Sequence, residues 1–244
     1  MREITPLVTR CTTTTGSQRY IMWHDFRESG VSASVNAEFS AVRGHAKVLM
    51  WKLYGHDSTH DELRDELIAR GCEENDHSTL MATPVRALFD ALATTQNNAS
   101  PEFTVRELVA AKELDAYQNI WDDVWPDAPN SRYVDDYRAL IEKHEPGIAF
   151  FAGFAGLGGD NPVTSGYMFH APGAPFALLC GGTTKAAWRR QHAYTRMLTI
   201  RTQAALERGA SYLAVEASPE SKPILERLGF VALSTLAFYE KHIG

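Results

Sequence analysis

The chain has 244 residues, of which 44% are hydrophobic, so it can bury a substantial core in one large domain or two small ones. Its formal net charge of -6 and its pI near 5.8 argue against a nucleic-acid surface, because phosphate binding needs a concentrated excess of Lys and Arg. The sequence has neither the apolar core of a signal peptide nor a stretch long enough to cross a bilayer, so we expect no membrane partner.

The three cysteines are widely separated in the sequence. Cys11, Cys72 and Cys180 form no C-x-x-C pair, so the sequence indicates neither a disulfide framework nor a thiolate zinc site. Cysteines used in this way are typical of a reducing compartment. We therefore expect a cytoplasmic protein.

The first hundred residues contain short strand patterns and one clear helix pattern. Apolar stretches rich in aromatic and β-branched residues predict strands at residues 19–23, 47–54 and 79–83. Between them, Thr59 and Glu62 have the spacing of a capping box, which predicts a helix that begins at Thr59 and ends at Gly71. The polar, turn-rich residues 93–101 then predict a domain boundary.

The second half has its own run of elements, in the order strand, two helices, three strands, helix, strand, helix, strand. Periodicity and turn residues place these elements at residues 103–108, 114–124, 133–141, 148–153, 163–170, 176–181, 192–208, 212–217, 220–228 and 231–239. This order indicates a mixed α/β fold. We expect two domains, residues 1–95 and 101–244.

Two motifs in the second half carry a family resemblance. Residues 189–194 read RRQHAY and open the longest predicted helix, and residues 225–230 read LERLGF. At this separation they resemble the Arg/Gln-x-x-Gly-x-Gly/Ala turn and the terminal Tyr-Glu-Arg-Leu-Gly-Phe motif of the GNAT acetyltransferase superfamily. The resemblance covers residues 101–244 and implies the GNAT fold, an α/β fold with a mixed sheet, and acetyl-CoA as co-substrate.

The first half resembles the end of the same fold. Its strand, helix and strand pass through Gly71-Cys72, which stands in place of Gly229-Phe230, but no basic turn precedes the helix. The resemblance therefore implies a tandem protein in which residues 1–95 are a degenerate GNAT-like half without a cofactor.

The predicted turn has a chemistry suited to the pyrophosphate of coenzyme A. Backbone N–H groups at a helix start form an anion site, and Arg189 and Arg190 would neutralise phosphate charge. In this family, glycines occupy the positions of His192 and Tyr194, and a tyrosine that returns a proton to the departing thiolate often occupies that of Leu225. The cofactor site that the resemblance implies consists of Leu179, Cys180, Gly181, Arg189, Arg190, Gln191, His192, Ala193, Tyr194, Thr195 and Ser218.

Acyl transfer to an amine also needs a path for the amine proton. Glu216 ends an apolar strand, where partial burial would make its carboxylate a better base, although an exposed strand-end glutamate is the alternative. Tyr239 is a candidate acid and His170 a candidate proton acceptor, although packing and loop roles also fit them. Ser218 also suits an N-cap. No His or Asp is placed in the sequence to activate Cys180, so we expect direct transfer without an acyl-enzyme.

The leading interpretation is an N-acetyltransferase that acts on an amine of a small molecule or a protein. The sequence leaves the acceptor and the oligomeric state open, a homodimer included. The departures at His192, Tyr194 and Leu225 favour a first alternative, a catalytically inactive binding or regulatory module derived from the GNAT fold.

A second alternative is a metal-dependent hydrolase built on the pairs His56-Asp57 and His60-Asp61. Histidines four residues apart on a helix can share a metal. Capping and the helix dipole explain Asp57 and Asp61 without one, so we expect no metal.

Overall fold

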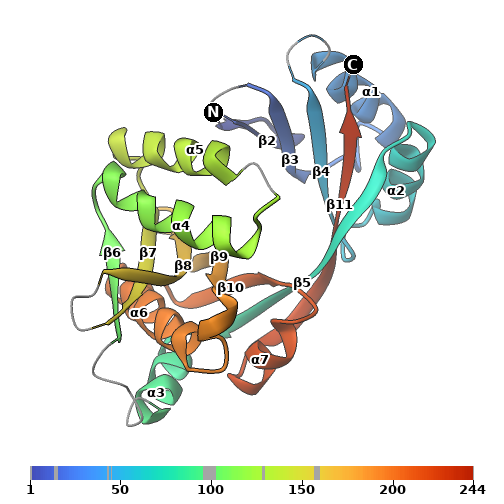
Figure 1. Ribbon diagram of the computed structural model, residues 1–244. Coiled ribbons are helices and arrows are strands. Elements are labelled where there is room, and N and C mark those ends of the chain that lie inside the picture. The colour runs from blue at the N-terminus through green and yellow to red at the C-terminus, as the bar shows by residue number, and fades with distance from the viewer. Residues whose placement is uncertain are drawn as a thin grey trace. The chain divides into compact units, whose positions relative to one another are not determined.

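The computed structural model describes residues 2–13, 16–42, 44, 46–95, 103–127, 130–156 and 160–243 (Figure 1). The chain forms two compact units. Unit 1 consists of Met1–Leu80, Ala217–Pro223 and Ala232–Gly244, and unit 2 of Met81–Glu216 and Ile224–Val231. None of the helices in these described ranges is long and apolar enough to cross a membrane.

Unit 1 is a sheet with two helices. Its strands lie in the order β1-β2-β3-β4-β11-β5. The strands β3 and β4 are parallel, whereas β1 and β2, β2 and β3, and β4 and β11 pair in antiparallel fashion. The elements are β1 (Arg2–Ile4), β2 (Val8–Thr12), β3 (Gln18–His24), α1 (Val31–Val42), β4 (Val48–Tyr54), α2 (His60–Ala69), β5 (Glu73–Pro84) and β11 (Val231–His242). Its core is apolar and includes Val8, Ile21, Trp51, Leu63 and Leu67.

The predicted strands and helix of the first half are confirmed, but the predicted cap of α2 is wrong. Thr59 precedes the helix with φ −106° and ψ 16° and makes no side-chain capping bond. Its backbone is not in the extended conformation that lets a cap side chain reach the N–H of N2 or N3. At the other end Gly71 has φ +74°, and the N–H of Cys72 donates to the carbonyl of Leu67 at 3.0 Å, so the predicted glycine stop is confirmed.

Four elements of the structure were not predicted from the sequence, namely β1, β2, α1 and α3 (Val85–Thr95). The helix α1 is rich in Ser and Val, which are poor helix formers, and it buries polar Ser34 and Glu38 beside Val35. The helix α3 occupies the start of the predicted linker at residues 93–95, whereas residues 96–102 lie outside the described part of the chain.

Unit 2 is a mixed sheet covered by helices on both faces. Its strands lie in the order β10-β9-β8-β7-β6, with the end of β5 next to β10, and only β9 and β10 are parallel among the pairs from β6 to β10. The elements after α3 are β6 (Phe103–Leu108), α4 (Asp115–Val124), α5 (Asn130–Glu142), β7 (Ile148–Ala155), β8 (Asn161–Phe169), β9 (Phe176–Thr184), α6 (Ala193–Glu207), β10 (Tyr212–Ala217) and α7 (Lys222–Arg227).

The alternation of side chains along β7 separates the two faces of this sheet. Phe150, Ala152 and Phe154 point into a core with α4 and α5, which lie over this face in Figure 1. The neighbouring strand residue Phe103 pairs with Ala155, so it belongs to the other face, and there it contacts α6. The helix α6 therefore lies opposite α4 and α5.

All ten elements predicted for the second half are present, β6 and β10 with the predicted bounds. The division between compact units does not fall where we expected the domain boundary, because β11 belongs mainly to unit 1 and the unit border interrupts β5 after Leu80. The division into residues 1–95 and 101–244 stays a prediction about the two halves of the tandem.

Candidate functional site

The strands β9 and β10 lie side by side for only part of their length. Their parallel pairing begins at Phe176 and Tyr212 and ends at Leu179 and Val215, while β9 continues to Thr184. Beyond Leu179, the edge of β9 that faced β10 has no strand partner in this register. The two strands therefore diverge after four paired residues.

The pairing of β9 with β8 is also interrupted at this point. The register changes from Ser165–Thr183 to Tyr167–Cys180, so it gives no partner to Gly166, Gly181 or Gly182. Gly181 has φ +58°, a conformation that glycine adopts at low cost. A β-bulge of this kind redirects backbone groups, and it lies where β9 has left β10.

The turn after β9 contains two residues with strained backbone. Arg190 and His192 have φ 61° and 62°, in the left-handed region that L-residues seldom adopt. His192 is the N-cap of α6, and its carbonyl accepts the first helical bond from the N–H of Arg196 at 3.0 Å. The family's glycine position therefore keeps a glycine-like conformation here, although the residue is histidine. Strain of this kind persists where the surrounding structure enforces it.

The turn also carries a local positive charge in an acidic protein. Between Lys185 and Leu206 the sequence has five basic residues and no acidic one. Arg189, Arg190 and His192 are exposed, and the Nε of Arg189 donates to the carbonyl of Thr184 at 3.1 Å. The N–H groups of the first turn of α6 have no earlier helical carbonyl to bond, so they add to the positive potential. The turn has the properties of an anion site.

Tyr194 stands at the family's second glycine position, and its side chain lies against the strand. A Cβ built on Gly182 would lie 3.2 Å from the Tyr194 ring, so the ring packs directly on the glycine of β9. Burial raises the pKa of the Tyr194 hydroxyl. The contact with Gly182 of β9 fixes the position of the Tyr194 ring beside the bulge.

The structure reveals a buried arginine that the sequence prediction missed. Arg201 of α6 is 2% exposed, and its Nη1 donates to the carbonyls of Tyr167 at 3.4 Å and Cys180 at 3.2 Å, on either side of the bulge. A face drawn through the apolar residues Ala193, Met197, Ile200 and Ala204 leaves Arg201 out. The buried stripe instead passes through residues 193, 197, 201 and 205, which is the i, i+4 spacing that would have found Arg201.

Several predicted site residues meet at the opening between β9 and β10. Glu216 is half-buried and follows Val215, the last paired residue of β10. On the facing strand, Leu179 pairs with Val215, and Cys180 and Gly181 follow it into the bulge. Glu216 thus lies directly after the paired part of β10, beside this opening.

His170 follows the end of β8 that pairs with the start of β9. It lies three strand residues, or roughly 10 Å, from Tyr167, which pairs with Cys180 at the opening. Its imidazole Nε2 donates to the carbonyl of Ala174 at 2.8 Å, and its backbone N–H donates to the carbonyl of Gly147 at 2.6 Å. His170 therefore stabilises the loop before β9, which is the structural role that the sequence left open for it.

Tyr239 and Ser218 belong to unit 1, and Leu225 to the core of unit 2. Tyr239 is 2% exposed in the unit 1 core, and burial raises the pKa of its hydroxyl to about 12. The Oγ of Ser218 accepts the N–H of Ser221 at 3.3 Å before α7, as a capping role requires. Leu225 is fully buried, so this position supplies packing and no proton.

The two His-Asp pairs of unit 1 make local contacts. The Nδ1 of His60 bonds the Oδ1 of Asp61 at 3.1 Å, and the Oδ2 of Asp57 accepts the N–H of Tyr54 at 2.9 Å. His56 packs against the Tyr54 ring, with centroids 5.4 Å apart. Across the described ranges, no group of three or more His, Cys, Asp and Glu gathers in a way that could hold a metal ion.

No family model and no curated protein sequence matches this chain at a significant level. Solved structures do match it. A GCN5-related N-acetyltransferase from Kribbella flavida superposes with a TM-score of 0.65 at 16% identity and covers 99% of this chain and 89% of its own.

Two further structures are similar at the level of the fold. A tandem GNAT protein from the clavulanic acid biosynthesis pathway has a TM-score of 0.67 at 11% identity, over 97% of this chain and 78% of its own. A GCN5-related glucosamine N-acetyltransferase region of a fungal multi-domain β-N-acetylglucosaminidase has a TM-score of 0.66 at 8% identity, over 96% of this chain and 31% of its own. These TM-scores show a shared fold, and at identities this low they show the fold alone.

Proposed function

The chain has the GNAT fold, and on this premise we propose that it is an N-acetyltransferase that moves acetyl from acetyl-CoA to an amine of a small molecule or a protein. One observation carries the proposal. The strained basic turn at residues 189–192 begins α6 directly after the part of β9 that has left β10. Anion binding and an open strand edge are thus adjacent, as a phosphate-bearing thioester requires.

We assign the phosphates of coenzyme A to the start of α6. Backbone N–H groups of Ala193, Tyr194 and Thr195 point along the helix axis toward this end, and Arg189 and Arg190 add positive charge. The pantetheine arm would pair with the backbone of β9 at Leu179–Gly181, where the pairing of β9 with β10 ends. The thioester would then lie at the bulge.

We assign the amine proton to Glu216, which lies at the same opening. A neutral amine attacks the thioester carbonyl, and a base within reach, directly or through one water, removes the proton that the new amide cannot keep. The transfer is direct. Cys180 lies in the adjacent strand, where its Sγ is 4.0 Å from the carbonyl of Leu178, and the sequence offers no His or Asp placed to activate it.

The test combines thiol release with product mass. The chain is incubated with acetyl-CoA and a panel of small amines and amino-terminal peptides, and free thiol and acetylated amine are measured together. We expect equimolar thiol and acetylated amine with at least one acceptor, and the same result for Cys180→Ala. An acetyl adduct on the protein that turns over and disappears in Cys180→Ala would contradict direct transfer.

A binding or regulatory module is the second candidate function. The observations that favour it are His192 and Tyr194 at the family's glycine positions and the fully buried Leu225 in place of an acid. Coenzyme A binding together with no acetylated product for any amine would favour this module over the enzyme.

A further inference from the structure

The buried guanidinium of Arg201 has an unusual environment. The side chain is 2% exposed, and its Nε makes no hydrogen bond to any described residue. Both hydrogen bonds of the group come from Nη1 and end on neutral carbonyls, those of Tyr167 and Cys180. A buried cation without a carboxylate partner is costly, so its retention calls for an explanation.

Two glycines make room for this charge beneath the bulge. A Cβ on Gly166 would lie 2.7 Å from the Nη1 of Arg201, and one on Gly182 would lie 3.6 Å from its Nη2. The guanidinium therefore lies against the backbone of β8 and β9 at the interruption in their pairing. The same stretch of β9 has left β10, so the charge lies beside the proposed path of the thioester.

The two tyrosines beside Arg201 do not neutralise it. Tyr117 and Tyr194 are its aromatic neighbours, and burial raises the pKa of both hydroxyls, so both stay uncharged at neutral pH. Burial also lowers the pKa of Arg201 itself, but an arginine begins far above neutrality and keeps its proton. A positive charge thus persists in a site from which water is largely excluded, where its field is strong.

A second observation points to a use for that charge. The GNAT resemblance implies a tyrosine that protonates the departing thiolate at the position of Leu225, and here that position is an apolar, fully buried side chain. We propose that Arg201 stabilises the thiolate of coenzyme A as it leaves, in place of a proton donor. This inference rests on the proposed acetyl transfer.

The step balances without an acid. The amine nitrogen forms a bond to the carbonyl carbon, the C–S bond breaks, and its electron pair stays on sulfur as the thiolate. The amine proton leaves through Glu216 or water. The thiolate takes its proton from solvent after release, so nothing has to protonate sulfur during the transfer.

The experiment measures the thiol pKa of coenzyme A bound to the protein. Thiolate absorbance in the ultraviolet is titrated for the parent, Arg201→Lys and Arg201→Met, and the complex with S-methyl-CoA, which has no thiol, supplies the blank for the protein's own cysteines. Arg196→Met is the matched control, because Arg196 lies on the same helix but donates to the carbonyl of Phe103.

We expect the parent to lower the bound thiol pKa by about one unit relative to free coenzyme A. Arg201→Lys should keep part of that shift, Arg201→Met should abolish it, and Arg196→Met should leave it unchanged. A parent complex with the thiol pKa of free coenzyme A, or an unchanged shift in Arg201→Met, would overturn the inference alone. Failure of the parent to bind coenzyme A would instead overturn the proposed function.

Discussion

The N-terminal ends of α2 in unit 1 and α6 in unit 2 differ in the charge of the residues around them, which decides whether a helix N-terminus can bind a phosphate. The first turn of α2 carries Asp61 and Glu62, whereas the first turn of α6 carries no acid and follows Arg189 and Arg190. Both helices present the positive end of a dipole. In unit 1 the protein's own carboxylates already complement that end, and in unit 2 it stays available to an anion from outside.

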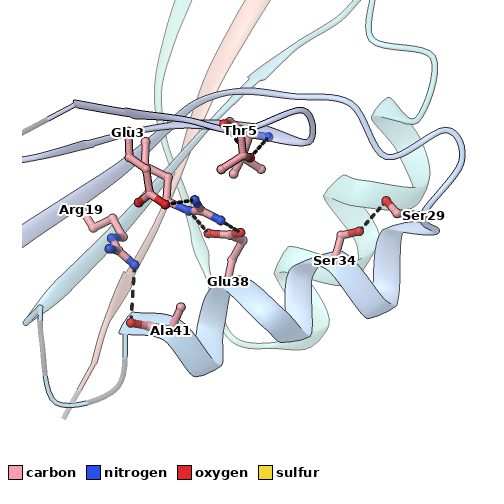
Figure 2. A network of polar contacts seen from close by, with 9 residues as sticks. Glu3, Thr5, Arg19, Ser29, Ser34, Glu38 and Ala41 are labelled. Carbon is pink, nitrogen blue, oxygen red and sulfur yellow. Dashed lines mark hydrogen bonds and ion pairs between the residues drawn. The ribbon is translucent and has the colours of Figure 1, made fainter.

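Buried charge differs between the units in the same way. In unit 1, Glu38 of α1 is 5% exposed and bonds the guanidinium of Arg10, with 2.6 Å between Nε and Oε2 (Figure 2). Glu38 and Ser34 line a cavity of about 390 Å³, but Ser34 is bonded to Ser29 at 2.7 Å, so the polar wall is paired internally. Among the described residues of unit 2, Arg201 has no carboxylate partner. The buried charge of Glu38 is thus paired within unit 1, whereas the buried charge of Arg201 in unit 2 is not paired with an opposite charge.

The largest effect should come from breaking the internal pair of unit 1. Glu38→Ala leaves the partly buried Arg10 without its partner and should lower the free energy of unfolding by about 3 kcal/mol. Arg201→Met removes a charge that bonds only neutral carbonyls among the described residues, so its cost should stay below about 2 kcal/mol. Urea unfolding measures both, with exposed Glu3→Gln as control at about 0–1 kcal/mol. Equal costs for Glu38→Ala and Arg201→Met would remove the contrast between the two charges.

The next effect concerns the charge beside α6. Arg189→Ala with Arg190→Ala should weaken acetyl-CoA binding about ten- to a hundredfold and flatten its salt dependence, because two charge-assisted phosphate contacts are lost. Arg27→Ala with Arg64→Ala, an exposed pair in unit 1, changes the net charge equally and should leave the affinity unchanged. Calorimetric titration at two salt concentrations compares them. An equal loss of acetyl-CoA affinity in both double variants would show that Arg189 and Arg190 act only through the net charge of the protein and not through contacts at the turn.

A smaller effect on turnover is expected from Glu216. Glu216→Gln removes the proposed base and should lower turnover at neutral pH at least about tenfold. Part of the rate should return at higher pH, where more of the amine is already neutral. Glu207→Gln, at the exposed end of α6, is the control. A pH-rate profile of Glu216→Gln that matches the parent throughout would retire Glu216 as the base.

The smallest effect should come from the strained N-cap of α6. His192→Gly relieves the strain of the left-handed backbone, because glycine adopts this conformation freely. The larger entropy of glycine in the unfolded chain offsets part of this gain, so the free energy of unfolding should rise by only about 0.5 kcal/mol. His192→Ala removes the same imidazole and keeps the strain, so it should not stabilise. Thermal unfolding of the two variants separates backbone from side chain. Equal stabilisation by glycine and alanine would locate the effect in the lost imidazole.

The sequence predicted the second half far better than the first. From Phe103 onward the strands are short apolar runs between turns rich in Gly and Pro, so each boundary has a local signal. In the first half, α1 buries the polar residues Ser34 and Glu38 through tertiary contacts. A pattern of apolar residues in the local sequence therefore does not predict this helix. The GNAT fold was nevertheless predicted from residues 189–194 and 225–230, and the structural similarities confirm it.

The parts of the candidate site that belong to a sequence motif could be predicted, whereas the parts that depend on packing could not. Motif positions placed the turn at Arg189–Thr195 after β9, but they could not show that His192 adopts the left-handed backbone in place of glycine. Arg201 was missed because an arginine on a helix is normally assigned to the solvent face. Only the glycines at 166 and 182 and the bulge they accompany create the space that buries it.

We propose that unit 2 presents an anion site for coenzyme A at α6 and that unit 1 presents none. Calorimetric titration of the whole chain with acetyl-CoA tests this difference. We expect a single class of site with one acetyl-CoA per chain. Two equivalent sites per chain, or no binding at all, would contradict it.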